Sequence, residues 1–180
     1  MFDFLFNPKG RISRKGWWLG FMLPYLAITI GLSIFAAFAP ILALLSTLAS
    51  LFYLWPSVVA VPVKRFHDLG MSGFWQLGFL VAEIVLTIGF FMGVGMYAAQ
   101  AGLEQDFANL GSLPSAEQGV VLRQTIGGAF GSGNVIVIAS TALLLVLNLA
   151  WFYFQGLKRG ELGDNKYAVD PLASGHGYAD

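Results

Sequence analysis

The chain has 180 residues, of which 57% are hydrophobic and only 11% are charged. A typical soluble protein carries about 25% charged residues, and a soluble surface of this size needs more polar side chains than the sequence holds. The composition therefore excludes an ordinary soluble domain and indicates an integral membrane protein. There are no cysteines, which excludes a disulfide framework, a thiolate metal site and a cysteine nucleophile.

Four segments are apolar and long enough to cross a bilayer, which takes about 20 residues. They cover residues 17–39, 40–63, 74–98 and 135–156. Because proline disfavours helix at the residue before it, Ala39-Pro40 is the predicted turn between the first two spans. The sequence thus predicts an all-α integral membrane fold, a bundle of four antiparallel transmembrane helices that forms one domain over residues 1–180.

The lysines and arginines predict the orientation of this bundle. In the four-span arrangement nine of the ten fall on one side, and only Arg123 falls on the other. Cytoplasmic segments of membrane proteins carry the excess of lysine and arginine. Both termini, with the tail at residues 157–180, are therefore predicted to be cytoplasmic.

The segment at residues 99–134 is the one long outer loop of the prediction. Ser115 and Gln118 have the spacing of a capping box, which predicts a short helix to about Ile126. The glycine-rich residues 127–133 are predicted to be a flexible connection. They lack the Lys-Ser/Thr of a phosphate-binding loop.

Glu83 is the only charge inside the third predicted span, and it lies near the middle of the membrane. Asn148 of the fourth span lies at a similar depth. An ionisable residue at such a depth is a candidate for function. One interpretation is a proton-binding or cation-binding carboxyl group of a small transporter or channel subunit. The other is a hydrogen-bonded residue that joins two helices.

Three cytoplasmic segments carry most of the remaining polar chemistry. They precede the first span, join the second span to the third, and follow the fourth. Since the N-termini of the first and third spans face the same side, this surface suits an anion. The opposing interpretation is a structural network in which Asp68, Asp164 and Asp170 pair with arginines. The candidate anion-binding or ligand-binding residues are Arg11, Arg14, Lys64, Arg65, His67, Asp68, Asn165 and Asp170.

The same segments give little indication of catalysis or of a metal. His67 stands beside Asp68, but no serine or cysteine nucleophile in a triad context accompanies them. The chain has two histidines, a poor basis for a metal site. Residues 160–171 hold spaced oxygens but lack the spacing of a calcium loop. We therefore expect no catalytic residue, no metal and no cofactor.

These segments together resemble the bacterial inner-membrane YhaH-like family, domain of unknown function 805. The family pattern is Gly-Arg-x-x-Arg with aromatics, then basic-x-His-Asp-x-Gly-x-Ser-Gly-aromatic, then Gly-x-Asn-x-Tyr…Asp-Pro. Lys64 stands where arginine is common, and Ala168-Val169 stand where Gly-Pro is common. The resemblance implies a polytopic protein of the bacterial inner membrane and no settled activity. The matching residues are Gly10-Arg11…Arg14…Trp17-Trp18, Arg65-Phe66-His67-Asp68-Leu69-Gly70-Met71-Ser72-Gly73-Phe74-Trp75 and Gly163-Asp164-Asn165-Lys166-Tyr167…Asp170-Pro171.

The function predicted from these features is a non-enzymatic membrane module. Its cytoplasmic Arg/His/Asp cluster would bind an anionic lipid headgroup, a phosphate-bearing ligand or a protein partner. The alternative is the transporter or channel subunit that uses Glu83. The expected partners are the lipid bilayer and anionic lipids, with no nucleic acid, and both a homo-oligomer and a membrane-protein partner are compatible with the sequence.

Overall fold

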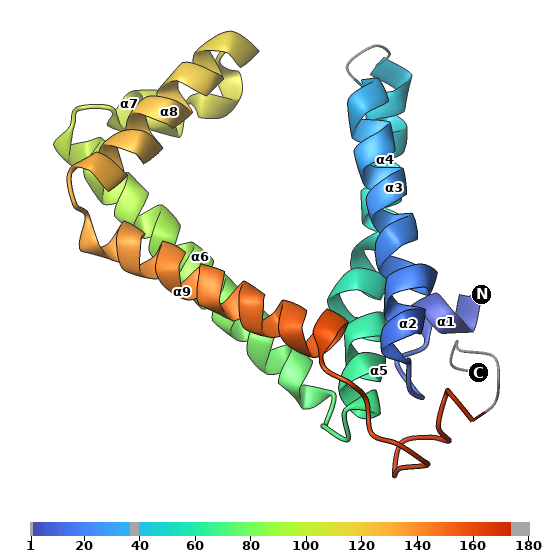
Figure 1. The fold of residues 1–180 in the computed structure, drawn as a ribbon. Coiled ribbons are helices and arrows are strands. Elements are labelled where there is room, and N and C mark those ends of the chain that lie inside the picture. The colour runs from blue at the N-terminus through green and yellow to red at the C-terminus, as the bar shows by residue number, and fades with distance from the viewer. Residues whose placement is uncertain (1, 37–39, 174–180) are drawn as a thin grey trace. The chain divides into compact units, whose positions relative to one another are not determined.

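The computed structural model describes residues 2–36 and 40–173, and the secondary structure of these residues is helical (Figure 1). No β-strand occurs in this part of the chain, where Asn165 and Ala168 form one isolated bridge. The prediction of an all-α fold is confirmed. The helices are α1 Phe2–Phe6, α2 Arg14–Gly16, η1 Trp17–Met22, α3 Leu23–Ala36, α4 Pro40–Trp55, η2 Pro56–Ala60, α5 Val61–Asp68, α6 Phe74–Gln100, α7 Glu104–Ala108, η3 Leu110–Ser112, α8 Ser115–Gly131, α9 Val135–Phe152 and η4 Tyr153–Leu157.

Three helical runs among the described residues are long and apolar enough to cross a membrane: Leu44–Asp68, Phe74–Gln100 and Val135–Leu157. Most of their side chains are not buried inside the chain, as expected of helices that face lipid. For the first predicted span, α2, η1 and α3 follow one another without a break as far as Ala36. Residues 37–39, which include its last residues and Ala39 of the predicted turn, lie outside the described residues, so the count of four spans stays a prediction.

The second predicted span ends later than its hydropathy indicates. Helix continues through η2 and α5 to Asp68, so the connection to α6 is the short turn at residues 69–73. Lys64 and Arg65 are helical because cations are favourable in the last turn of a helix. Gly70, which follows the C-cap residue Leu69 of α5, has φ +70°. Glycine adopts this conformation without steric cost.

The chain divides into two compact units. The first unit comprises the chain up to Leu80 together with the residues from Ala150 onward. Its core is a buried group of Leu5, Ile12, Trp17, Phe21 and Val61, with Tyr25, Tyr53 and Trp151 packed around it. All three π-helical segments, η1, η2 and η4, belong to this unit.

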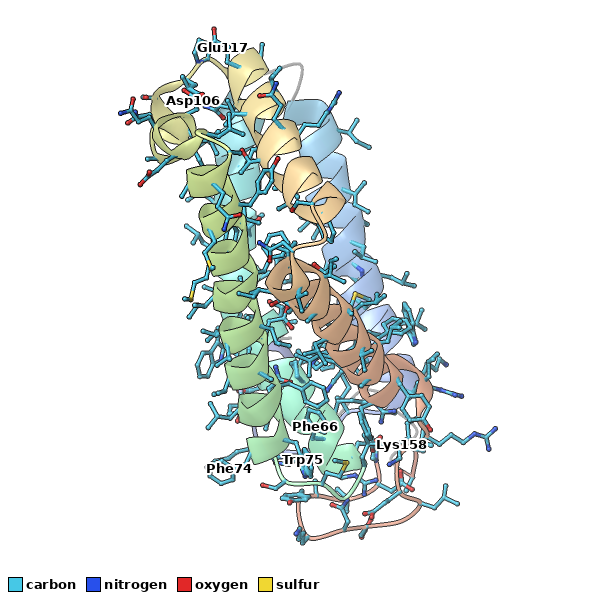
Figure 2. All side chains as sticks on the ribbon, turned by 90° about the vertical axis from the view of Figure 1, so that its left-hand side faces the viewer. Phe66, Phe74, Trp75, Asp106, Glu117 and Lys158 are labelled. Carbon is cyan, nitrogen blue, oxygen red and sulfur yellow. The ribbon has the colours of Figure 1, made fainter. Side chains whose placement is uncertain are left out.

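The second unit is Val81–Leu149. Val94, Ala129 and Val137 form its buried core, which brings together α6, α8 and α9. Asp106 of α7 and Glu117, near the start of α8, project away from this core (Figure 2). Residues 99–134, the predicted outer segment, are thus largely helical and pack against α6 and α9 of the same unit.

Two predictions about this outer segment are wrong. Ser115 is the first residue of α8 and follows Pro114, and the Gln118 side chain donates to the Leu113 carbonyl at 2.8 Å in place of a capping box. The glycine-rich residues 127–131 are helical. A Cβ at Gly128 would stand 2.2 Å from the Tyr97 hydroxyl. The close approach that glycine permits here outweighs its low helix propensity.

Close packing between α6 and α9 gives a matched test in the second unit. A Cβ at Gly93 would stand 2.8 Å from Val137 Cγ2, whereas a Cβ at Gly95 would meet nothing within 4 Å. We expect Gly93→Ala to lower the free energy of unfolding by about 1–3 kcal/mol because the core is overpacked. Gly95→Ala should stabilise the helix by up to about 1 kcal/mol. Thermal unfolding of both variants in the same detergent, followed by circular dichroism, measures the difference, and equal behaviour would contradict it.

Candidate functional site

Three segments that are far apart in the sequence meet at one place in the first unit. The His67 ring nitrogen Nδ1 lies 3.1 Å from the Gly10 carbonyl oxygen. The Asn165 amide in turn donates to the His67 carbonyl at 2.9 Å. The convergence of the three predicted motif segments is therefore found in the structure, and we call this region the polar end.

Arg11 is the residue that draws the three segments together. Its side chain is buried, and Nε and Nη2 donate to Asp68 Oδ1 at 3.3 and 3.1 Å. Nη2 also donates to the Glu161 carbonyl, and Nη1 to the Gly163 carbonyl, both at 2.6 Å. A further Nη1 contact reaches the Ala168 carbonyl at 3.5 Å. A guanidinium has five N–H donors, so Arg11 has no donor left for an external anion.

Arg65 is committed in the same way. It is fully buried, and Nε donates to the Gln155 carbonyl at 2.8 Å. Nη1 donates to Asp68 Oδ2 and Nη2 donates to the Lys158 carbonyl. The carboxylate of Asp68 thus lies between two guanidinium groups, one oxygen to each. This Arg11–Asp68–Arg65 cluster favours the structural interpretation of these three residues over direct anion binding.

Lys64 and His67 are also held by the chain itself. The Lys64 ammonium donates to the carbonyls of Asp3 at 2.8 Å and Phe4 at 3.0 Å. Because the Gly10 carbonyl can only accept, Nδ1 of His67 must carry the proton in this contact. The imidazole stacks on the Tyr167 ring at a centroid distance of 4.0 Å. The sequence singled out both residues, and the structure assigns them contacts that hold α1 and the tail in place.

Asn165 and the two tail aspartates shape the last turn. Asn165 Oδ1 accepts from the Tyr167 amide at 3.0 Å. Asp170 Oδ2 accepts from the Gly163 amide at 2.8 Å, and Oδ1 accepts from the Leu172 amide at 2.9 Å. Asp164 Oδ1 accepts from the Asp170 amide at 2.9 Å. The hydrogen bonds of both aspartates therefore go to backbone amides where the sequence predicted partner arginines, because the turn leaves those N–H groups without helical acceptors.

A hollow of about 530 Å³ lies beside the Arg11–Asp68–Arg65 cluster. Arg14 donates to the Leu157 carbonyl at 3.2 Å through Nη1, and within the described residues its other N–H groups have no acceptor. Lys15 and Arg159 are exposed and, within the described part of the chain, have no hydrogen bond. We call this region the cationic hollow; its lining is Ser13, Arg14, Lys15, Asp68, Arg159, Gly160, Glu161, Leu162, Asp170 and Leu172.

Two buried residues of the polar end were not among the candidate binding residues of the sequence analysis. Gln155 and Trp17 are fully buried, and neither the Gln155 amide nor Trp17 Nε1 has a hydrogen-bond partner among the described residues. They lie in the π-helical segments η4 and η1. π-Helical turns occur often at functional sites. Trp17 belongs to the motif before the first predicted span, and Gln155 is a single glutamine in the last apolar run.

Glu83 and Asn148 lie together in the second unit. Asn148 Nδ2 is 3.2 Å from Glu83 Oε2, and it also donates to the Leu144 carbonyl of its own helix at 2.9 Å. This contact joins α6 to α9. It favours the interpretation of Glu83 as a helix-joining residue over that of a cation carrier.

A family model described as "Protein of unknown function (DUF805)" matches residues 5–168. The uncharacterized protein YiiR of Escherichia coli strain K12 is 35% identical over 87 residues, which are 47% of this chain and 57% of YiiR. The YiiR protein of Escherichia coli O157:H7 matches with the same identity and coverage. The matched region thus spans little more than half the length of these relatives. No solved structure matches the chain.

The Arg11–Asp68–Arg65 cluster predicts a large effect of one substitution. Asp68→Ala leaves two buried guanidinium groups without their carboxylate. Breaking a buried ion pair from one side typically costs about 3–5 kcal/mol. We expect a loss of that size in the free energy of unfolding, measured by denaturant titration in detergent. Asp106→Ala, on the exposed helix α7, is the control and should change it by less than about 0.5 kcal/mol. Equal stabilities of the two variants would contradict the role of Asp68.

The tail turn should respond to pH through Asp170. Hydrogen bonds from the backbone amides of Leu172 and Gly163 hold the pKa of this carboxyl below its ordinary value of 3.8. A carboxyl group whose pKa is lower in the folded state stabilises the fold above its unfolded pKa. That contribution is lost as the pH falls through the folded pKa.

We therefore expect hydrogen-exchange protection of the Gly163 and Leu172 amides to be constant above pH 3.8 and to fall below it. The protection is measured relative to the intrinsic exchange rate at each pH. Asp170→Asn is the control, since it removes the titrating group, and its protection should not depend on pH in this range. The same dependence of protection on pH in the unsubstituted chain and in Asp170→Asn would rule out this role of the carboxylate.

Proposed function

This chain belongs to the DUF805 family of proteins of unknown function, and from that premise we propose that it is a non-enzymatic membrane module that binds the phosphate of an anionic lipid headgroup. The binding site is the cationic hollow of the polar end. The observation that carries the proposal is the contrast between two sets of cations. Arg11 and Arg65 are consumed by internal acceptors, whereas Arg14, Lys15 and Arg159 border the hollow with N–H groups to spare.

The acidic residues of the hollow have partners within the chain. Asp68 is neutralised by two arginines, and Asp170 accepts two backbone amides. Glu161 accepts from the Asn165 amide at 3.1 Å. Three cations therefore border the hollow, and its carboxylates are held by hydrogen bonds within the chain. A phosphate with several acceptor oxygens fits such a set, since charge-assisted hydrogen bonds are the strong ones.

The proposed topology is four spans with both termini on the cytoplasmic side of the bacterial inner membrane. Its support is the excess of lysine and arginine at the polar end. The hydrogen bonds of Arg11 to the tail add to it, because they join the N-terminal segment to the residues after α9. An N-terminal segment that is joined to the residues after the last predicted span fits an even number of crossings. The exposed aromatics Phe74 and Trp75 at the start of α6 suit a membrane interface (Figure 2).

Anionic lipids lie in the leaflet next to this proposed polar end, and each cation near the surface contributes about 1 kcal/mol to their binding. The alternative, a transporter or channel subunit, rests on Glu83 alone. Its hydrogen bond to Asn148 supports a structural role for that residue.

The lipid proposal is tested with the purified full chain and vesicles of phosphatidylcholine, with or without phosphatidylglycerol. We expect Lys15→Ala/Arg159→Ala to weaken the preference for phosphatidylglycerol by roughly tenfold or more, from about 1 kcal/mol per cation. Arg123→Ala, which removes an exposed cation from α8, is the control and should leave the preference unchanged.

Unaltered preference in the double variant would overturn the proposal. A loss of binding free energy in Arg123→Ala that is half of the loss in the double variant would also overturn it, since the effect per cation removed would then be the same and would be one of net charge. Both substitutions concern exposed residues, and the fold of each variant is checked by circular dichroism before the lipid measurement.

A further inference from the structure

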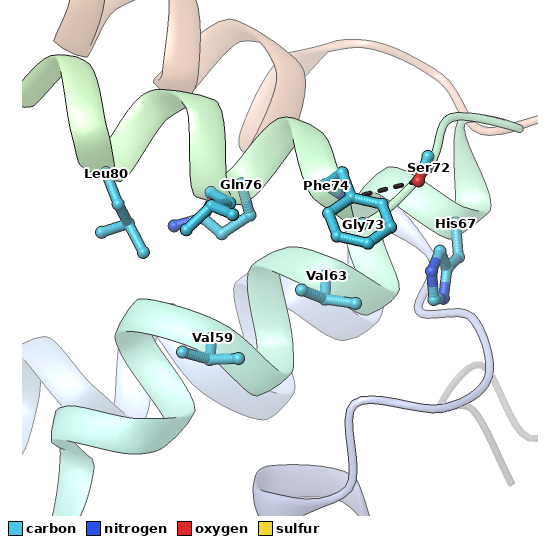
Figure 3. A pocket seen from close by; sticks show the side chains of 9 residues that line it. Val59, Val63, His67, Ser72, Gly73, Phe74, Gln76 and Leu80 are labelled. Atoms are coloured by element: carbon cyan, nitrogen blue, oxygen red, sulfur yellow. Dashed lines mark hydrogen bonds between the residues drawn. The ribbon is translucent and has the colours of Figure 1, made fainter.

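A second pocket of the first unit, of about 350 Å³, lies between the end of the second predicted span and the start of the third. Figure 3 shows Val59 and Val63 on one side of it and Leu80 on the other, with His67 and Ser72 at one end. Its volume falls in the range of about 300–1,000 Å³ that is typical of small-molecule sites. The pocket is separate in its walls from the cationic hollow, with which it shares no lining residue.

The walls of this pocket are held in position by contacts of their own. Gln76 is buried; its amide donates to the Val58 carbonyl at 2.8 Å, and its oxygen accepts from Trp151 at 3.0 Å. Gly73 leaves space at the end of the pocket where His67 and Ser72 lie. A Cβ there would stand 2.7 Å from Val63 Cγ1 and 3.2 Å from His67 Nε2. These contacts fix the position of the start of α6 against the end of the second predicted span.

His67 and Ser72, at one end of the pocket, offer one hydrogen-bond acceptor and one donor. His67 Nδ1 is occupied by the Gly10 carbonyl, so the neutral imidazole presents Nε2 as an acceptor. No hydrogen bond of Nε2 occurs within the described residues. Ser72 Oγ accepts from the Phe74 amide at 3.3 Å, which leaves the hydroxyl proton to donate. A ligand hydroxyl can satisfy both groups, donating to His67 and accepting from Ser72.

The rest of the lining points to an acyl chain. Val59, Val63, Leu77 and Leu80 are aliphatic and lie on helical runs that are apolar enough to cross a membrane. Leu77, at the pocket, is 55% exposed, so the pocket is continuous with the surface that faces lipid. None of the lining residues is an acid, a lysine or an arginine. A charged headgroup would therefore find no partner here, in contrast to the cationic hollow.

From this arrangement we infer that the pocket binds a neutral acyl lipid with a free hydroxyl group, of the diacylglycerol class. The acyl chain lies along the aliphatic walls, and the hydroxyl lies between His67 and Ser72. The inference does not depend on the proposed headgroup site. A soluble small molecule and a non-selective boundary lipid are the competing occupants.

The test uses the full chain in nanodiscs of phosphatidylcholine that contain diacylglycerol with a photoreactive diazirine in one acyl chain. After irradiation, mass spectrometry locates the labelled peptides. We expect labelling to concentrate on residues 59–80 and to fall about fivefold when the diacylglycerol hydroxyl is acetylated, as for the loss of one hydrogen bond. This comparison uses the unsubstituted chain and needs no variant.

Two substitutions sharpen the test. Leu77→Trp fills the pocket from its exposed rim and should remove most of the labelling, whereas Leu145→Trp, at a position 61% exposed on α9, is the matched control. Ser72→Ala should bring the labelling by the free and acetylated lipids closer to parity. Labelling that is unchanged in Leu77→Trp would overturn the site, since it would show only boundary lipid. Equal labelling by the two lipids in the unsubstituted chain would overturn the assignment of the hydroxyl.

Discussion

The pairing of one buried carboxylate with two buried guanidinium groups is the interaction on which the polar end depends. Asp68 ends α5, while Arg11 lies in the N-terminal segment and Arg65 lies one turn back on the same helix. Burying any one of these charges alone is costly, and only the set with its carbonyl acceptors is satisfied. Because each charge needs the others, the first and the last motif segments are held at the end of the second predicted span. Residues of each motif thereby contact residues of the other two.

This internal pairing also separates structure from binding among the cations. Arginines whose N–H groups are taken up by carbonyls and a carboxylate hold the fold. The cations around the hollow are the ones whose donors remain available. The same logic distinguishes the two pockets. One is bordered by cations and suits a phosphate. The other has aliphatic walls with a single acceptor and donor at its end, which suits a neutral lipid.

Helix boundaries and site partners could be predicted only in part. Hydropathy located the starts of α4, α6 and α9, because bilayer-crossing segments must satisfy their backbone within a helix. It ended the second span at residue 63, since Lys64 and Arg65 read as a loop, although the helix continues to Asp68. The glycines of α8 likewise indicated flexibility, because propensity is a local quantity and takes no account of Tyr97 packed against Gly128.

The sequence by itself determined the membrane character, the helical class and the three segments that carry polar chemistry. These follow from composition and from local patterns, which need no knowledge of distant neighbours. Only the tertiary structure decided which arginine meets which acceptor, and so which cations remain free. It also decided that His67 presents one nitrogen to an apolar pocket while the other is occupied. Hydrogen bonds between residues such as Arg11 and Gly163 span most of the chain, and no local pattern encodes a contact of that range.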